Sequence, residues 1–239
     1  MAFRTVALGD GLRGPVLRME MIDVGIERAD VCPYLGYRSA DTPSANIASL
    51  IDDCIAKSLA LLQPAFSYVI RNVSSVEGPI SVLDDGSRFE SEIIARLLEQ
   101  CKKVAVYVST IGSQIEDMSS ALAEDGFITE AYVVDSIGSS AAEKLAEAVH
   151  KKIAEEALAL GLCVSRRFSP GYCDWHIDQQ SVIFGIAGGD SAGVHLTSDC
   201  LMVPRKSSSG ILGIGCCDGC VETYNPCVTC GKVGCPGRR

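Results

Sequence analysis

The sequence predicts an α+β fold on three observations. Segments with helical periodicity and segments with strand character are both frequent, but they do not alternate in the strict strand–helix–strand order of a parallel sheet. No phosphate-binding turn leads from a strand into a helix. The 239 residues are 47% hydrophobic and 21% charged, which supplies a core for one large domain or two small ones and argues against disorder.

The helices are predicted from apolar residues that recur every three or four positions. The first helix follows Asp41 and Thr42, either of which can cap it, and Pro43, whose missing N–H costs nothing in a first turn. Pro64 ends this helix. The others are expected over residues 89–101, 112–122, 127–160 with a bend near Gly138, and 178–184.

The strands are predicted from short apolar runs between turn residues. They are expected over residues 65–73, 79–83, 104–108, 163–168, 194–201 and 211–214. Residues 104–108 form an unbroken apolar run, which is typical of a buried strand. Residues 167–175 lie between predicted elements and are expected to form an irregular loop.

Residues 9–14 match the pattern G-x-G-x-x-G, which often marks a dinucleotide site. Such a site needs a helix that starts at the glycines and points its N-terminus at the pyrophosphate. Here Pro15 and an alternating stretch follow instead. We therefore expect no dinucleotide site.

The net charge of −9 disfavours a general nucleic-acid binder, because no broad basic face would neutralise phosphates. No run of 18 apolar residues is present, so no membrane span is expected. The first 18 residues lack the apolar stretch of a secretory signal. These features predict a cytoplasmic protein in a reducing compartment, where disulfides are not the default.

Twelve cysteines are divided between the body of the chain and its end. Six are scattered and are expected to be small core residues: Cys32, Cys54, Cys101, Cys163, Cys173 and Cys200. Cys216 and Cys217 precede Cys220-x6-Cys227-x2-Cys230-x4-Cys235, four thiols at a spacing that suits zinc or an iron–sulfur cluster. A disordered thiol-rich tail and redox disulfides are the alternatives.

The predicted loop at 167–175 is the first candidate binding site. Arg167 can hold a carboxylate by two parallel hydrogen bonds. Gly171 permits close approach of a ligand to the backbone, and Tyr172 and Trp175 offer flat surfaces. The residues alone fit either a site for a small zwitterion with an aromatic ring or a structural loop with a surface arginine.

This loop, Arg-Phe-Ser-Pro-Gly-Tyr, resembles the S-adenosylmethionine-binding loop of the activation domain of cobalamin-dependent methionine synthase, in its short stand-alone form. Further stretches resemble the same family in the same order: Tyr-Leu-Gly-Tyr at 34–37, Ser-Thr-Ile-Gly at 109–112, Ala142–Glu147, and Leu-Thr-Ser at 196–198 with Val203, Pro204, Lys206 and Ser207. The resemblance suggests an irregular segment over 1–30, the activation domain over 31–215 and a Cys-rich tail over 216–239.

The resemblance implies a twisted antiparallel sheet flanked by helices, with S-adenosylmethionine in a shallow groove. Arg167 would hold its carboxylate, and the backbone at Ser169 and Tyr172, with Pro170 and Gly171 in the same loop, would meet the adenosine. Glu143 would face the amino group, although Glu147 lies one helical turn further on. No nucleophile–base arrangement or carboxylate pair is evident, so no catalytic residue is expected.

The family's reaction is a reductive methylation, in which cob(II)alamin gains an electron and takes a methyl group from S-adenosylmethionine. The resemblance thus implies a protein that reactivates a partner methionine synthase carrying cobalamin, with a reductant protein as electron source. The alternative is an iron–sulfur or zinc-binding redox or interaction protein that serves another corrinoid methyltransferase. Two departures are notable: Cys173 stands where short members have glycine, and a late tyrosine ligand has no counterpart.

Overall fold

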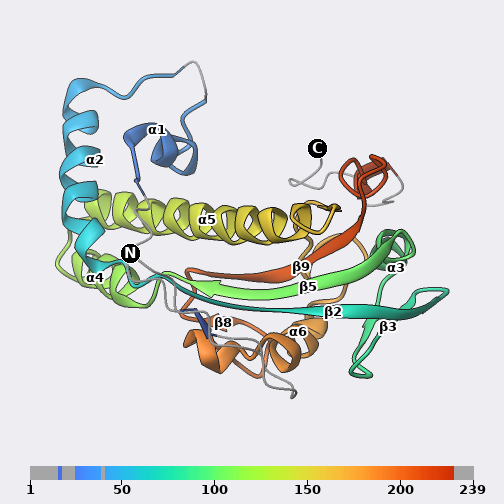
Figure 1. Ribbon diagram of the computed structural model, residues 1–239. Coiled ribbons are helices and arrows are strands. Elements are labelled where there is room, and N and C mark those ends of the chain that lie inside the picture. The colour runs from blue at the N-terminus through green and yellow to red at the C-terminus, as the bar shows by residue number, and fades with distance from the viewer. Residues whose placement is uncertain (1–15, 18–24, 39–40, 229–239) are drawn as a thin grey trace.

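The computed structural model describes residues 16–17, 25–38 and 41–228, and its centre is an antiparallel sheet (Figure 1). The strand order is β4-β3-β2-β5-β9-β6, and β1 pairs with β2 beside this path. The strands are β1 Val16–Leu17, β2 Ala65–Glu77, β3 Ile80–Leu83, β4 Arg88–Glu90, β5 Cys101–Thr110, β6 Leu162–Val164 and β9 Ser207–Cys216. β7 His195–Leu196 and β8 Met202–Val203 form a separate pair. The α+β class and the antiparallel sheet are confirmed.

Helices cover both faces of this sheet, so the protein has three layers (Figure 1). The α-helices are α1 Arg28–Val31, α2 Ala45–Ser58, α3 Glu92–Leu98, α4 Gln114–Glu124, α5 Ile128–Leu158 and α6 Gln180–Ala187. Short 3₁₀ turns are η1 Cys32–Leu35, η2 Leu59–Leu61, η3 Ile177–Gln179, η4 Gly189–Ala192 and η5 Pro226–Val228. α2, α4 and α5 contribute side chains to the core on one face, while α3 and α6 contribute to the core on the other.

Strand β5 shows how one strand supplies two cores. Its Ala105 and Tyr107 belong to the core under α5, whereas Val104, Val106 and Val108 belong to the core under α3 and α6. Successive side chains of a strand point to opposite faces, so a strand buried on both faces is apolar at every position. This explains the unbroken apolar run in the sequence.

Helix α5 is continuous over 31 residues, and the bend expected near Gly138 is absent (Figure 1). The glycine has a packing role instead. A Cβ added to Gly138 would lie 2.7 Å from Ile115 Cγ2 and 3.2 Å from Lys206 Cε. Gly138 therefore allows α4 and the start of β9 to approach α5 closely.

Several boundaries differ from those predicted. Phe89, expected in a helix, lies in β4, and Ser91 caps α3 by accepting a hydrogen bond from the Ile94 N–H at 3.1 Å. The expected strand over 163–168 is short, since β6 ends at Val164 and Phe168 makes only an isolated bridge to Ile211. Instead of one strand over 194–201, the short pair β7 and β8 forms.

The N-terminal region, expected to be irregular, contributes β1 and α1 to the fold. The Gly9–Gly14 pattern lies outside the described residues. Among the helices that the structure describes, none combines the length and apolarity needed to cross a bilayer.

Candidate functional site

The loop that begins at Arg167 lies against the first half of β9. Phe168 exchanges two backbone hydrogen bonds with Ile211, and the Ser169 hydroxyl donates to the Ser209 carbonyl at 2.6 Å. The loop and β9 approach each other closely, because a Cβ added to Gly210 would lie 2.2 Å from the Phe168 carbonyl oxygen. The start of the loop is therefore fixed against the central sheet.

The far end of the loop is anchored on α3. The Asp174 carboxylate accepts hydrogen bonds from the Ser91 hydroxyl at 2.7 Å and from the Glu92 N–H at 2.6 Å. Trp175 is 2% exposed and packs edge-on against Phe89, with ring centroids 5.4 Å apart. Trp175, which we expected to offer a flat surface to a ligand, is thus a core residue that holds the loop.

Between these anchors the backbone turns sharply. Gly171 has φ +92° and donates its N–H to the Trp175 carbonyl, and Pro170 precedes it. Tyr172 remains 63% exposed at the tip. Cys173 has φ +54°, in the left-handed region that favours glycine. The glycine of the short family members suits this backbone conformation better than cysteine does.

The structure brings Arg167 and Glu143 together. The guanidinium of Arg167 forms an ion pair and a hydrogen bond with the Glu143 carboxylate of α5. The Arg167 side chain is 19% exposed and that of Glu143 is 47% exposed. The pair is thus partly open to solvent, and Glu143 is not an internal acid.

Tyr107 also lies near Arg167, a role that could not be predicted from the sequence because Tyr107 lies within an apolar strand. Burial raises the pKa of the Tyr107 hydroxyl, while its hydrogen bond with Ser208 and the charge of Arg167 act in the opposite direction. The Tyr107 and Ser208 oxygens are 3.3 Å apart. The neutral phenol therefore lies beside the guanidinium.

Three further groups surround the ion pair. Burial, and then the charges of Glu143 and Glu147, raise the pKa of Tyr34, which belongs to the Tyr-Leu-Gly-Tyr stretch. Burial, and then the charge of Arg167, lower the pKa of His150. Glu143, Glu147 and His150 recur at helical spacing along α5 and so share a face. His150 is partly exposed.

The tail cysteines are described only in part. Cys220 is exposed, and its pKa is raised by the neighbouring Asp218 carboxylate. The Cys227 N–H donates to the Asn225 side chain at 3.0 Å. Cys230 and Cys235 lie outside the described residues, so the four-cysteine metal site stays a prediction.

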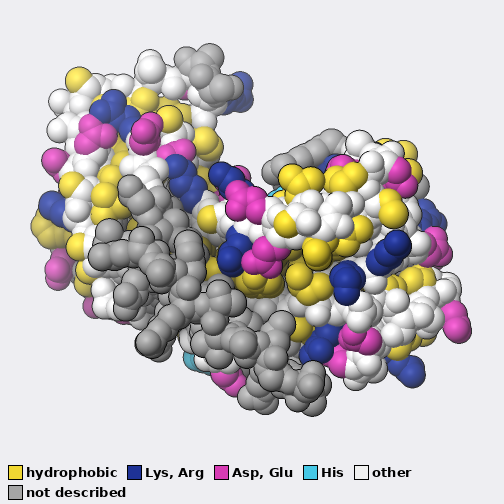
Figure 2. Space-filling view, in the orientation of Figure 1, with side chains coloured by type: hydrophobic (Ala, Val, Ile, Leu, Met, Phe, Trp, Pro, Cys, Tyr) yellow, Lys and Arg dark blue, Asp and Glu magenta, His cyan; other side chains and the backbone are white. Residues whose placement is uncertain are grey.

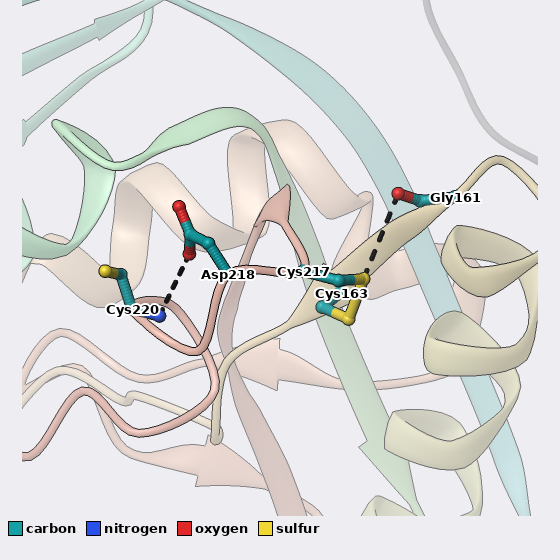
Figure 3. Close-up of a disulfide and its surroundings, with 5 residues drawn as sticks. All are labelled: Gly161, Cys163, Cys217, Asp218 and Cys220. Carbon is teal, nitrogen blue, oxygen red and sulfur yellow. Dashed lines mark hydrogen bonds between the residues drawn. A yellow bond between two sulfur atoms is a disulfide. The ribbon is translucent and has the colours of Figure 1, made fainter.

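A disulfide joins Cys163 to Cys217, which corrects two expectations (Figure 3). The sequence predicts a core thiol at Cys163, and disulfides are not its default, although redox disulfides are one of the alternatives for the tail cysteines. β6 and β9 pair with Cys163 opposite Gly215, and the chain then carries Cys217 back beside Cys163. Sequence spacing could not indicate this pair, because 54 residues separate its members.

A cavity of about 510 Å³ lies beside α6. Its lining comes from β2, α6, η4 and β7, including Val69, Phe184, Asp190 and His195. None of its lining residues belongs to α5 or to the loop at 167–175. This cavity is therefore separate from the Arg167–Glu143 pair.

Comparison with known proteins adds information about the fold alone. No family model matches this chain, and no curated protein matches it. A solved structure described as the MetH reactivation domain bound to AdoHcy matches with a TM-score of 0.57 and 14% sequence identity. The match covers 77% of this chain and 73% of that one. The chain therefore has the fold of the MetH reactivation domain.

Proposed function

We propose that this protein binds S-adenosylmethionine at the Arg167–Glu143 pair and supports reductive methylation of cob(II)alamin on a partner methionine synthase. The ion pair, at the start of the loop that resembles the family's binding loop, carries the proposal. The similar fold was solved with AdoHcy bound, which supports a ligand of this class.

The donor set suits an α-amino acid. The carboxylate of an amino acid can accept two hydrogen bonds from the planar guanidinium of Arg167, and its ammonium group can pair with the Glu143 carboxylate. In the protein alone these two groups neutralise each other. A zwitterion that inserts between the two groups gives each of them a new partner of opposite charge, so neither charge is left unpaired.

The protein contributes to the reaction by holding S-adenosylmethionine in position. S-adenosylmethionine supplies the methyl group, and the partner's cobalamin receives it. Arg167 and Glu143 hold the amino-acid end of the ligand, while the loop from Ser169 to Tyr172 holds the nucleoside end. Fixing the sulfonium in line with an incoming nucleophile removes much of the entropic barrier, and no general base is needed. The proposal places this step in the cytoplasm, with a reductant protein as electron donor.

Calorimetry with S-adenosylmethionine tests the binding site. Arg167→Ala should weaken binding by about 2 kcal/mol, roughly 30-fold, because a charge-assisted pair is lost. Arg166→Ala changes the neighbouring arginine and should leave the affinity unchanged. Equal affinity in the wild-type protein and Arg167→Ala would count against the site. Methylcobalamin formation, assayed with a cob(II)alamin-loaded partner and a reductant, tests the reaction itself.

The alternative remains an iron–sulfur or zinc-binding protein that serves another corrinoid methyltransferase. The tail set of Cys220, Cys227, Cys230 and Cys235 supports it. An anaerobically purified sample without iron, sulfide or zinc would remove this alternative. Failure to bind S-adenosylmethionine, combined with a bound metal, would favour it.

A further inference from the structure

The end of the sheet where β6 and β9 pair carries a cluster of metal-binding side chains that the proposed function does not use. The ligand atoms of Cys163, Cys217 and Glu222 all lie within 4.8 Å of one another. Cys163 lies in the middle of β6, Cys217 follows the last residue of β9, and Glu222 lies in the next turn. Three chain segments therefore converge on one point.

The segment that carries Glu222 is held on both sides. Val221, which precedes it, is 1% exposed and lies against Gly215, where an added Cβ would be 2.8 Å from Val221 Cγ2. Tyr224, which follows, donates its hydroxyl to the Ile93 carbonyl at 2.8 Å. The Glu222 carboxylate is thus positioned by its anchored neighbours, whereas its own side chain is exposed.

The three donor atoms lie close enough together to be rearranged around one tetrahedral ion once the disulfide is reduced. Thiolates bind zinc at about 2.3 Å and carboxylates at about 2.0–2.2 Å, which separates two ligand atoms by roughly 3.3–3.8 Å. The two sulfurs are bonded to each other in the disulfide, and side-chain rotation after reduction would separate them. The Cα atoms of Cys163 and Cys217 are 4.9 Å apart, so the backbone need not move far for both sulfurs to reach one ion.

We propose that Cys163, Cys217 and Glu222 form a site for Zn²⁺ when the cysteines are reduced, and that the disulfide is the oxidised state of this site, which cannot bind the ion. Two thiolates and a carboxylate give three negative charges and a soft donor set that prefers zinc to magnesium or calcium. Water completes the coordination. Because oxidation uses both sulfurs for the disulfide, metal binding depends on the redox state of the pair.

The redox step balances with a phosphine or a dithiol as reductant. A phosphine takes an oxygen atom from water and becomes its oxide, while the disulfide gains two electrons and two protons and becomes two thiols. A dithiol does the same by exchange and becomes a disulfide itself. Zinc binding then releases the two thiol protons. The inference does not rest on S-adenosylmethionine binding.

The test separates this site from the predicted tail site. A background variant carries Cys227→Ser, Cys230→Ser and Cys235→Ser, which leaves the proposed ligands intact. It is reduced with a phosphine and titrated with Co²⁺, a spectroscopic substitute for zinc, under argon. We expect thiolate-to-cobalt charge-transfer absorption that saturates with one ion per chain and is displaced by Zn²⁺. The oxidised protein should show none.

Single changes in that background identify the ligands. Cys217→Ser should weaken cobalt binding by about 100-fold or more and Glu222→Gln by about tenfold, since even outer-shell changes cost 10–100-fold at metal sites. Cys216→Ser is the matched control, because this exposed cysteine is adjacent to Cys217 but is not in the cluster. Figure 3 shows the Cys220 sulfur pointing away from the disulfide, so Cys220→Ser should also bind normally.

Three outcomes would overturn the proposal. The first is that the reduced background variant binds no cobalt. The second is that Cys217→Ser binds cobalt as tightly as the background variant. The third is that excess phosphine does not reduce the disulfide of the folded protein. Thiol titration and circular dichroism of each sample show that the cysteines are reduced and the protein is folded. Loss of S-adenosylmethionine binding would leave this result unaffected.

Discussion

Arg167 and Glu143 form an ion pair that ties the loop after β6 to the middle of α5, although 24 residues separate them in the sequence. Tyr107 on β5 lies beside the guanidinium, and Tyr34 on η1 lies beside the carboxylate. Four elements therefore meet at one pair of opposite charges. In Figure 2 the outline of the molecule is hollowed above α5, between the end that carries α1 and α2 and the end that carries the cysteine-rich turn.

Glu143→Gln should weaken S-adenosylmethionine binding about tenfold in calorimetry. The change keeps the size of the side chain but removes the charge that faces the ligand's ammonium, and a hydrogen bond to a charged group is worth about 1.5–3 kcal/mol. The amide still donates and accepts, and Arg167 is freed from its partner, so only part of this energy is lost. Glu147→Gln is the matched control one turn further along α5.

A second ligand sharpens this comparison. 5′-Methylthioadenosine has the nucleoside end without the amino-acid end, so its affinity should be the same in the wild-type protein and Glu143→Gln. If Glu147→Gln weakens S-adenosylmethionine binding and Glu143→Gln does not, the acid that faces the ligand's ammonium is Glu147, one helical turn further along α5. If both variants bind S-adenosylmethionine like the wild-type protein, neither of these acids on α5 contributes to binding.

Asp174→Ala should destabilise the protein by about 1–2 kcal/mol, measured as the free energy of unfolding in urea. Its carboxylate accepts from Ser91 and from the Glu92 N–H at the start of α3, and loss of a capping carboxylate costs about 1 kcal/mol or more. Asp178→Ala, which removes a carboxylate that is 74% exposed, should change stability by no more than about 0.5 kcal/mol. Equal stabilities of the two variants would show that the loop is not held through α3.

The elements with strong local signals could be predicted from the sequence. The first long helix, the strand at Val104–Val108 and the long helix that contains Glu143 were all expected, because apolar periodicity and proline positions are local properties. Their edges were less certain. β2 runs to Glu77, well beyond the apolar stretch, because β3 pairs with its outer, partly exposed part from Val73 to Glu77, whereas the pairing with β5 ends at Asn72.

The features that were missed depend on contacts between distant segments. Trp175 was interpreted as a ligand surface, but whether an aromatic residue is buried depends on the partner it meets, here Phe89. The Cys163–Cys217 pair is created by strand pairing that no spacing rule contains. The motif around Arg167 made it a candidate ligand, which stays a prediction, whereas Tyr107 and His150 come near it only through the fold.

Gly138→Ala should destabilise the protein by about 1 kcal/mol or more, although alanine is the better helix former. The new methyl group would overlap Ile115, which is fully buried, and overpacking a core typically costs about 1–3 kcal/mol. Gly185→Ala is the control, since an added Cβ at this α6 position meets nothing within 4 Å. It should stabilise the protein by up to about 1 kcal/mol. A stabilised Gly138→Ala would disprove the close approach of α4 and α5.

His150→Gln should reduce the loss of stability on acidification. Burial and the charge of Arg167 lower the pKa of His150 below its ordinary value of 6.5, so the folded state binds a proton less readily than the unfolded state. The penalty is absent above pH 6.5, grows as the pH falls below it, and is complete below the folded-state pKa. The free energy of unfolding, measured in urea across this range, should therefore fall less steeply for His150→Gln than for the wild-type protein. Parallel curves for the wild-type protein and His150→Gln would mean that Arg167 and the surrounding core do not act on this imidazole.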